Sequence, residues 1–423
     1  MSVAPARTCA YGVLRRVFEQ GAFADRALRS AAAELDARDR ALATTLVFGT
    51  VQRRRTLDHV LAALSSRPLE RLEPAALAAL RLGAFQLLFL DGVSDYAAVD
   101  DSVELAKLHS RGGGPTVNAV LRRTAREGPG LLAALDDSTP AGAAILHSVP
   151  DWLAELWWRE LGPEEARALL AVVNQPAEAA IRVNTLRARP EEVIESLPVP
   201  ATPASELPEG LVLGGPFDAH GSELWRAGAI MPQSRGSMLV SRMLDPRAGD
   251  RVLDLCAAPG GKTTHLAALM DGAGEVVAVE SHPGRAGALQ RTCERMGAAG
   301  VSVRCEDGRG FTAKQPFDRV LVDPPCSGLG TLQSRPDLRW QPRRGELAEL
   351  AAMQSQLLQA GADALAPGGT LVYSVCTISR IEGDQVVDDF LARDGRFACE
   401  QRRQLLPSRD RTDGFFIARL DRS

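Results

Sequence analysis

The chain has 423 residues, of which 45% are hydrophobic and 24% are charged. At about 150 residues per domain, this length predicts roughly three domains, and the composition excludes a largely disordered or collagen-like chain. The longest apolar stretch, residues 82–90, is far shorter than the roughly 20 residues of a membrane-spanning helix. The amino-terminal segment also lacks the continuous apolar core of a secretory signal. We therefore expect a cytoplasmic protein with no membrane partner.

The seven cysteines and the charge distribution further narrow the class of protein. The cysteines are odd in number, and no two have the close spacing of paired zinc ligands, so we expect neither a disulfide framework nor a bound metal. Residues 1–130 carry 18 Lys and Arg against 14 Asp and Glu, whereas the rest of the chain carries 31 against 39. The small positive surplus of the first third fits a nucleic-acid partner or an ordinary solvated helical surface equally well.

Hydrophobic periodicity divides the first half of the chain. Apolar residues recur at helical spacing from residue 7 to about 126, which predicts an all-α domain over 1–130. Gly-Pro-Gly at 128–130 and Ser-Thr-Pro-Ala-Gly at 138–142 are typical of loops, and we therefore expect a linker over 131–149. Residues 150–235 mix helical and strand-like segments and predict a small α+β domain, with expected elements at 180–186 (strand), 190–197 (helix) and 211–213 (strand).

Residues 236–423 predict an α/β domain of the Rossmann-like type. Short apolar strands alternate there with amphipathic helices, a pattern typical of a doubly wound parallel sheet. In such sheets, ligands bind beyond the carboxyl ends of the strands. The predicted strands are 251–256, 275–280, 301–307, 317–323 and 370–376.

A glycine-rich turn follows the first of these strands. Its residues are Cys256, Ala257, Ala258, Pro259, Gly260, Gly261 and Lys262. Such a turn lets a ligand approach the backbone and meet the N–H groups of the next helix. A phosphate-binding P-loop would need glycine at the position of Cys256, and the dinucleotide pattern G-x-G-x-x-G is absent. A nucleoside cofactor without a pyrophosphate remains, and S-adenosylmethionine fits.

The other predicted strands end in acids and thiols. Glu280 could bind a ribose diol, Asp307 could accept from an adenine amino group, and Asp323 follows the fourth strand. A single acid at such a place is more often a solvated turn or a cap. Cys326 and Cys376 follow the fourth and fifth strands, and each is a core thiol or a nucleophile with about even odds.

These residues resemble the Sun/RsmB family of RNA cytosine-C5 methyltransferases. The resemblance covers essentially the whole chain and rests on LDLCAAPGGKTTH, DPPCSGLGTLQSRPDLRW, LVYSVCT and DGFFIARL. The helical region, with FGTVQRRRTLD and VNAVLRR, is similar to the NusB-like RNA-binding domain, and RVNTLR is similar to a short element of the family's middle domain. The resemblance implies S-adenosylmethionine as cofactor and RNA as partner, most often 16S ribosomal RNA, with neither DNA nor a second subunit.

The family's residue roles follow from the same resemblance. It implies that Cys376 is the nucleophile, that Cys326 assists product release, and that Asp323 contacts the cytosine with help from Lys262. The implied cofactor site comprises Cys256, Ala257, Ala258, Pro259, Gly260, Gly261, Lys262, Glu280, Asp307 and Asp323. DNA cytosine methyltransferases use the thiol of a Pro-Cys pair instead, so Pro325-Cys326 is the rival nucleophile; the second cysteine and the NusB-like region favour Cys376.

Three departures from the family pattern affect the geometry of the cofactor site and the docking of the substrate. Residues 233–235, Gln-Ser-Arg, stand where relatives usually carry an acidic pair; Glu280 replaces an aspartate; and Gly383 replaces an asparagine.

Two alternative functions stay open. One is the same chemistry on transfer RNA or another ribosomal site, and the other is an RNA-binding assembly factor that has lost catalysis.

Overall fold

The computed structural model describes residues 3–341 and 345–423, which fall into two compact units. Unit 1 consists of Met1–Gln175 and Leu332–Gln341, and unit 2 of Pro176–Thr331 and Pro342–Ser423. The chain therefore leaves unit 1, builds most of unit 2, returns to unit 1 for ten residues, and then completes unit 2.

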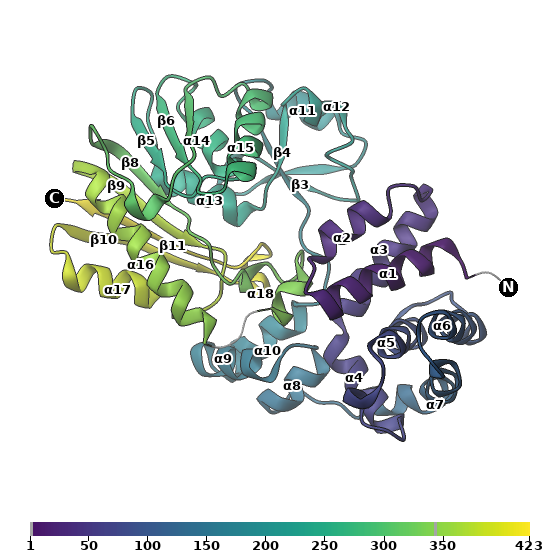
Figure 1. Cartoon of the computed structure of the whole chain (residues 1–423). Coiled ribbons are helices and arrows are strands. Elements are labelled where there is room, and N and C mark those ends of the chain that lie inside the picture. Colours follow the sequence, from purple (N-terminus) through teal and green to yellow (C-terminus); the bar gives the residue numbers. More distant parts are fainter. Residues whose placement is uncertain (1–2, 342–344) are drawn as a thin grey trace. The chain divides into compact units, whose positions relative to one another are not determined.

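Unit 1 is built from helices packed around an alanine- and leucine-rich core (Figure 1). The helical spacing of its apolar residues predicts this arrangement, and the expectation of an all-α amino-terminal domain is confirmed. In the described part of the chain, no helix is long and apolar enough to cross a membrane. The helices are α1 (Pro5–Gln20), α2 (Ala24–Ala31), α3 (Ala37–Gln52), α4 (Arg54–Leu64), η1 (Leu69–Arg71), α5 (Pro74–Phe89), α6 (Asp95–His109), α7 (Gly113–Ala133), α8 (Pro140–Leu146), α9 (Asp151–Leu161) and α10 (Pro163–Val172).

The segment expected to be a linker, 131–149, is largely ordered as helix. It contains the end of α7 and the whole of α8. Thr139 caps α8 by accepting from the N–H of Gly142, and Pro140 occupies the first helical turn, where its missing N–H costs nothing. Proline and glycine here start a helix rather than exclude one. The expected domain boundaries remain a proposal.

The returning segment, residues 332–341, is fixed in unit 1 by a buried arginine. Arg339 is 0% exposed and its guanidinium donates hydrogen bonds to acceptors from four separate stretches of the unit. These acceptors are the carbonyl oxygens of Gln52, Ser148, Val173, Leu332 and Pro336 and the side-chain oxygen of Asn174. Trp340 adds a hydrogen bond from its indole N–H to the carbonyl of Val51, 2.9 Å away.

Unit 2 begins with a four-stranded antiparallel sheet in the order β2-β3-β1-β4. This sheet and the helix α11 contain the strands and helix expected over 180–213, so the prediction of a small α+β region is confirmed. The elements are β1 (Ala180–Val183), α11 (Pro190–Ser196), β2 (Ala201–Ala204), β3 (Leu207–Leu213), α12 (Glu223–Arg226) and β4 (Ile230–Pro232).

The rest of unit 2 is a seven-stranded sheet in the order β10-β11-β9-β8-β5-β6-β7. The five predicted strands pair in parallel, but β11 pairs antiparallel with β9 and β10 antiparallel with β11. The five expected parallel strands are confirmed, and the sheet also has an antiparallel edge that the sequence did not predict, where the closing hairpin needs no crossover helix. The strands are β5 (Arg251–Asp254), β6 (Glu275–Val279), β7 (Val301–Arg304), β8 (Phe317–Val322), β9 (Leu365–Val375), β10 (Phe397–Leu405) and β11 (Phe415–Arg422).

Helices cover both faces of this sheet, as a Rossmann-like fold requires (Figure 1). One core holds apolar side chains of α16 and α17, and the other holds those of α13, α14 and α15. The short helices of unit 2 are η2 (Gly308–Gly310), η3 (Leu329–Thr331) and α18 (Pro407–Asp410), whereas η4 (Pro336–Trp340) belongs to the segment that returns to unit 1. The covering helices are α13 (Arg235–Leu244), α14 (Gly261–Leu269), α15 (Pro283–Met296), α16 (Glu346–Ala364) and α17 (Asp384–Arg393).

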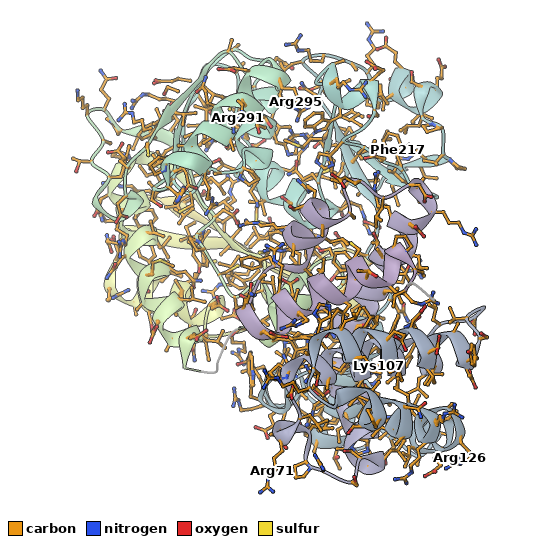
Figure 2. All side chains as sticks on the ribbon, turned by 45° about the vertical axis from the view of Figure 1, so that its right-hand side comes forward. Arg71, Lys107, Arg126, Phe217, Arg291 and Arg295 are labelled. Carbon is orange, nitrogen blue, oxygen red and sulfur yellow. The ribbon has the colours of Figure 1, made fainter. Side chains whose placement is uncertain are left out.

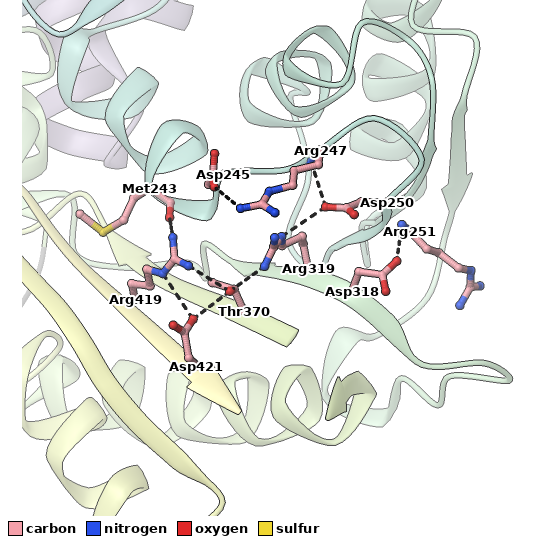
Figure 3. Close-up of polar contacts among 10 residues, drawn as sticks. All are labelled: Met243, Asp245, Arg247, Asp250, Arg251, Asp318, Arg319, Thr370, Arg419 and Asp421. Atoms are coloured by element: carbon pink, nitrogen blue, oxygen red, sulfur yellow. Dashed lines mark hydrogen bonds and ion pairs between the residues drawn. The ribbon is translucent and has the colours of Figure 1, made fainter. Parts of the chain in front are cut away.

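A polar network ties together the amino-terminal ends of the parallel strands (Figure 3). Arg319 at the start of β8 pairs with Asp250 and donates to the hydroxyl of Thr370, which in turn donates to Asp421. Arg419 contacts the same Thr370 and Asp421 from β11. These contacts occupy the amino-terminal edge of the sheet, whereas the acids and thiols singled out from the sequence lie at the carboxyl edge.

Candidate active site

The glycine-rich turn between β5 and α14 has a backbone that only glycine fits at one position. Gly260 has φ of +102°, and a Cβ placed there would lie 2.9 Å from Cδ1 of Leu289. The N–H of Ala257 donates to the carbonyl of Val279 on the neighbouring strand, 2.9 Å away. Helix α14 begins at Gly261, so its first N–H groups are available to a ligand at this turn.

Two buried oxygen atoms near this turn have no hydrogen-bond partner among the described residues. They are Oδ1 of Asp254 and Oε1 of Gln233. The other carboxylate oxygen of Asp254 accepts from the hydroxyl of Thr263 at 2.7 Å. Burial raises the pKa of Asp254 to about 7. A buried unpaired acceptor is costly, so a cofactor that brings donors to the turn fits the residues present.

Arg182 supports the same turn from β1. Its guanidinium donates to the carbonyl of Gly261 at 2.7 Å and to the hydroxyl of Thr264 at 2.8 Å, and the side chain is fully buried. Arg182 belongs to the RVNTLR element, whose sequence predicted no role for this side chain. These contacts link β1 of the small sheet to the turn within unit 2.

An ion pair lies between the turn and the end of β8. Nζ of Lys262 lies 2.8 Å from Oδ2 of Asp323, and the hydroxyl of Ser374 donates to Oδ1 of Asp323 at 2.8 Å. Burial alone would lower the pKa of Lys262, but the Asp323 carboxylate outweighs it and the pKa is raised. Lys262 therefore stays charged. Ser374, on the strand that leads to Cys376, was not predicted as a site residue.

The two cysteines that follow β8 and β9 face each other. Sγ of Cys326 and Sγ of Cys376 are 3.3 Å apart, and both are free thiols. The loop of Cys326 is held against the other loop by a hydrogen bond from the N–H of Gly330 to the carbonyl of Cys376, 3.0 Å long. The close pairing arises because β8 and β9 are neighbours in the sheet.

The surroundings of the two sulfur atoms differ in charge. The hydrogen bond from Cys326 lowers the pKa of Cys376; the charge of Lys262 acts in the same direction, while burial and the charge of Asp323 oppose it. The same hydrogen bond raises the pKa of Cys326, and burial raises it further. The thiolate is thus favoured on Cys376 and the thiol on Cys326.

The remaining predicted residues lie at the ends of β6 and β7. Glu280 is 5% exposed, accepts from the N–H of His282 at 2.9 Å and pairs with Arg285, whose guanidinium also donates to the carbonyl of Ala258 in the turn. Asp307 is exposed and pairs at 2.6 Å with Arg309; this pairing lowers its pKa. Glu280 is therefore linked to the turn, whereas Asp307 contacts its own loop.

Cys256 belongs to the turn but not to the thiol pair. Burial raises its pKa, and the charges of Asp254, Asp323 and Glu280 raise it further, so its sulfur stays protonated. Within the residues that the structure describes, no group of three or more His, Cys, Asp or Glu side chains could hold a metal ion.

Three family models match this chain. A NusB-family model matches residues 4–126, a ferredoxin-like domain model of RsmF/B-like methyltransferases matches 149–220, and the model of the 16S rRNA methyltransferase RsmB/F matches 241–421. Relatives are similar over the full length. A probable ribosomal RNA small subunit methyltransferase B of Synechocystis is 35% identical, and the match covers 99% of each chain.

The chain belongs to the RsmB/F family of 16S rRNA methyltransferases. The ribosomal RNA small subunit methyltransferase B of Thermus thermophilus is 38% identical over 94% of this chain and 92% of its own. Among solved structures, that of PH0851 has a TM-score of 0.84 and 28% identity, with complete coverage of both chains. The structure of NSun6 from Pyrococcus horikoshii, 23% identical with a TM-score of 0.60, covers 66% of this chain and 99% of its own, and shares the fold.

Two departures from the RsmB/F pattern have structural explanations. Arg235 forms a two-pronged ion pair with Glu178, at 2.6 and 2.7 Å, and also donates to the carbonyls of Asp410 and Arg411. A Cβ at Gly383 would lie 2.9 Å from the ring of Phe416, so the packing of that ring leaves no room for asparagine. Neither departure removes a side chain from the thiol pair or from the Lys262–Asp323 ion pair.

Proposed function

We propose that this methyltransferase acts on C5 of a cytosine in 16S ribosomal RNA, through a covalent bond between Cys376 and C6 of the base. The single observation that carries the proposal is the thiol pair. The Cys376 sulfur, with its lowered pKa, lies 3.3 Å from a second thiol at the edge of the sheet that holds the cofactor turn. Cytosine C5 is a weak nucleophile, and a thiolate adding to C6 overcomes that weakness.

The cofactor is S-adenosylmethionine, and the residues of the turn fit it. The segment 256–262 would hold it with backbone N–H groups and the unpaired oxygen of Asp254. Glu280 would accept from the ribose and Asp307 from the adenine, with Asp323 at the reacting side. When bound, the cofactor supplies an electrophilic methyl group on a sulfonium sulfur, which leaves as a neutral thioether.

Cys376 starts the reaction by adding to the base. Its thiolate forms a bond to C6, and the electron pair of the C5–C6 double bond moves into the ring, so that C5 becomes nucleophilic. Asp323 would accept a hydrogen bond from the C4 amino group and orient the base edge, and the positive charge of Lys262 beside it would stabilise the negative charge that develops at N3. Lys262 keeps Asp323 oriented and favours the thiolate of Cys376.

Cys326 would assist the release of the product. Once C5 carries the methyl group, a general base takes up the proton on C5 and the C5–C6 double bond re-forms. The bond between C6 and the Cys376 sulfur then breaks and gives back the thiolate. Cys326 lies beside that departing sulfur. A thiol in this position assists the elimination of the Cys376 sulfur without itself forming a bond to the cytosine.

The helical unit would recognise the RNA. Figure 2 shows Arg71, Lys107 and Arg126 on this unit, and all three side chains are exposed. Exposed cations attract phosphate groups whatever the base sequence, and the target base must leave its stack to reach a thiol. Relatives named as small-subunit ribosomal RNA methyltransferases support 16S RNA over transfer RNA. An enzyme of this kind would act as a monomer, without DNA, in the cytoplasm.

Bisulfite sequencing of total RNA from cells with and without the gene tests the proposal. We expect one protected cytosine in small-subunit RNA to become unprotected when the gene is removed. An unchanged profile in that RNA would contradict the proposal. If a cytosine in transfer RNA or in another ribosomal RNA changed instead, the chemistry would stand and the substrate would be corrected. An RNA-binding factor without catalysis would leave every cytosine unchanged.

A further inference from the structure

A buried glutamate connects the two loops that carry the cysteines. Glu382 is 0% exposed. Its Oε1 accepts from the backbone N–H of Ser327 at 2.8 Å, and its Oε2 accepts from the Ser327 hydroxyl at 2.5 Å and from the Thr377 hydroxyl at 3.3 Å. Ser327 directly follows Cys326, and Thr377 directly follows Cys376. One carboxylate therefore binds the residue next to each reactive thiol.

Further contacts fix the glutamate itself. The amide of Gln354 on α16 donates to Oε1 of Glu382 at 3.1 Å and to the carbonyl of Pro325 at 2.9 Å. The hydroxyl of Tyr373 donates to the backbone carbonyl of Glu382 at 2.6 Å. The hydroxyls of Ser327 and Thr377 also lie 2.8 Å apart. Every polar atom of this buried network has a partner, which makes the arrangement rigid.

We propose that Glu382 is the positioning residue of the thiol pair, setting the distance and orientation of Cys326 and Cys376 through Ser327 and Thr377. The proposal rests on the proposed function for the consequence in catalysis, but the geometry of the pair is measurable without it. The hydrogen bonds of the Glu382 carboxylate go to Ser327, Thr377 and Gln354 and not to either sulfur atom. It acts through its neighbours and is not a catalytic residue.

The need for a carboxylate follows from the number of donors. Two oxygen atoms receive four hydrogen bonds, which an ionised carboxylate can do and an alanine cannot. Glutamine keeps the length of the side chain and one acceptor oxygen. Its amide N–H groups can donate to the hydroxyl oxygens of Ser327 and Thr377 once those hydroxyl groups rotate. The negative charge of Glu382 also contributes to the raised pKa of Cys326, after the neighbouring thiol and burial.

The first test measures the alignment of the thiols without any RNA. The purified full-length protein is treated with diamide, which accepts two electrons and two protons as Cys326 and Cys376 join in a disulfide, and the product is followed by peptide mass spectrometry. We expect Glu382→Ala to slow formation of this disulfide at least about tenfold, because the loops are no longer held together. Glu400→Gln, a change on the exposed part of β10, should leave the rate unchanged.

The second test separates kcat from KM in methyl transfer to 16S ribosomal RNA transcribed in vitro. A misplacement of about 1 Å can cost roughly 100-fold in rate. We therefore expect Glu382→Ala to lower kcat about 100-fold with the KM for S-adenosylmethionine changed less than threefold, since Glu382 contacts no residue of the cofactor turn. Glu382→Gln should recover at least about tenfold of the lost kcat. A uniformly unstable fold would not give this split or this rescue.

The outcomes are distinguishable. Unchanged disulfide formation and unchanged kcat in Glu382→Ala would overturn the positioning role and leave the proposed function intact. A wild-type protein that forms the disulfide but methylates no cytosine would overturn the proposed function alone. If the alanine variant does not fold, Glu382→Gln and Glu382→Asp are compared. The shorter aspartate cannot reach both loops, so equal disulfide rates in these two variants would overturn the proposal.

Discussion

The pKa values of Cys326 and Cys376 shift in opposite directions, first because of the hydrogen bond between them and then because the charges around the two sulfur atoms differ. Cys376 lies near the charged amino group of Lys262, whereas Cys326 lies near the carboxylate of Glu382. The hydrogen bond between the sulfur atoms lowers the pKa of Cys376 and raises the pKa of Cys326, so the thiolate is favoured on Cys376. The two thiols therefore have separate roles available before any substrate binds, and this asymmetry favours Cys376 over the Pro325-Cys326 alternative.

Substitution of each cysteine tests this division of roles. We expect Cys376→Ala to abolish turnover, because no group remains to add to C6. Cys326→Ala should instead accumulate a covalent complex of protein and RNA, since the addition proceeds and the release is slowed. The complex is measured as a shifted band on a denaturing gel with labelled RNA. A stable complex in the Cys376→Ala variant would reverse the assignment.

Asp254 gives the protein without cofactor a distinct dependence on pH. Its pKa is raised by burial to about 7 in the folded state, against about 3.9 in the unfolded chain. The folded state therefore prefers the protonated acid. The contribution of Asp254 to stability is fully present below about pH 4 and is lost as the pH rises towards 7, by at most roughly 4 kcal/mol.

Asp254→Asn removes this titration while keeping the acceptor for Thr263. We expect the free energy of unfolding of the variant, relative to wild type, to increase between pH 4 and 7 and to stay constant above that range. Urea unfolding at a series of pH values without S-adenosylmethionine measures it. Asp389→Asn on the exposed side of α17 is the control, and identical pH slopes for wild type and Asp254→Asn would contradict the expectation.

At the scale of elements, the turn between β5 and α14 is held by packing and by hydrogen bonds to its backbone. Gly260 combines a left-handed backbone with close packing against Leu289. Arg182 fixes the carbonyl of Gly261, and Arg285 fixes the carbonyl of Ala258. The backbone of the turn is thus held from two sides, which presents its N–H groups to a cofactor in one arrangement.

Gly260→Ala should disturb this turn. The added Cβ would meet Leu289 at 2.9 Å and an alanine resists φ of +102°. We expect the dissociation constant for S-adenosylmethionine, measured by calorimetry, to rise at least about tenfold. Gly249→Ala is the matched control, because Gly249 has φ of +92° but open space around it. Equal affinities of the two variants would show that the close packing is irrelevant to binding.

At the scale of the whole molecule, the chain passes between the two units more than once. Residues 332–341 belong to unit 1, although the segments before and after them build unit 2. Arg339 fills a buried position in unit 1, and burial lowers its pKa to about 9. Neither unit is a continuous stretch of sequence, so truncation at a simple boundary removes part of the core of unit 1.

Removal of the Arg339 side chain tests how much the returning segment stabilises unit 1. Arg339→Ala leaves several buried carbonyl oxygens without a donor, each costing about 1–3 kcal/mol. We expect the melting temperature to fall by several degrees in the full-length protein. Arg335→Ala, a change in the same segment at a side chain stacked on Phe23, should have a much smaller effect. A melting temperature within one degree of wild type for Arg339→Ala would contradict this role.

The sequence alone determined the fold classes, the order of the parallel strands in the chain and the family, and it predicted the cofactor turn. These features depend on local patterns: helical periodicity, short apolar runs, and a glycine-rich turn after a strand. The sequence could not determine the antiparallel edge formed by β10 and β11, because pairing partners are set by tertiary packing. It also missed Glu382, Ser374 and Arg182, whose partners lie up to 82 residues away.

Only the tertiary structure decided how the site is assembled. Cys326 and Cys376 are 50 residues apart in sequence and 3.3 Å apart in space, because β8 and β9 pair side by side. The hydroxyl residue after each cysteine was the one sequence signal of a shared partner. Nothing local distinguishes the glutamate that both contact from an exposed acid, since burial is a property of the packed chain rather than of any single segment.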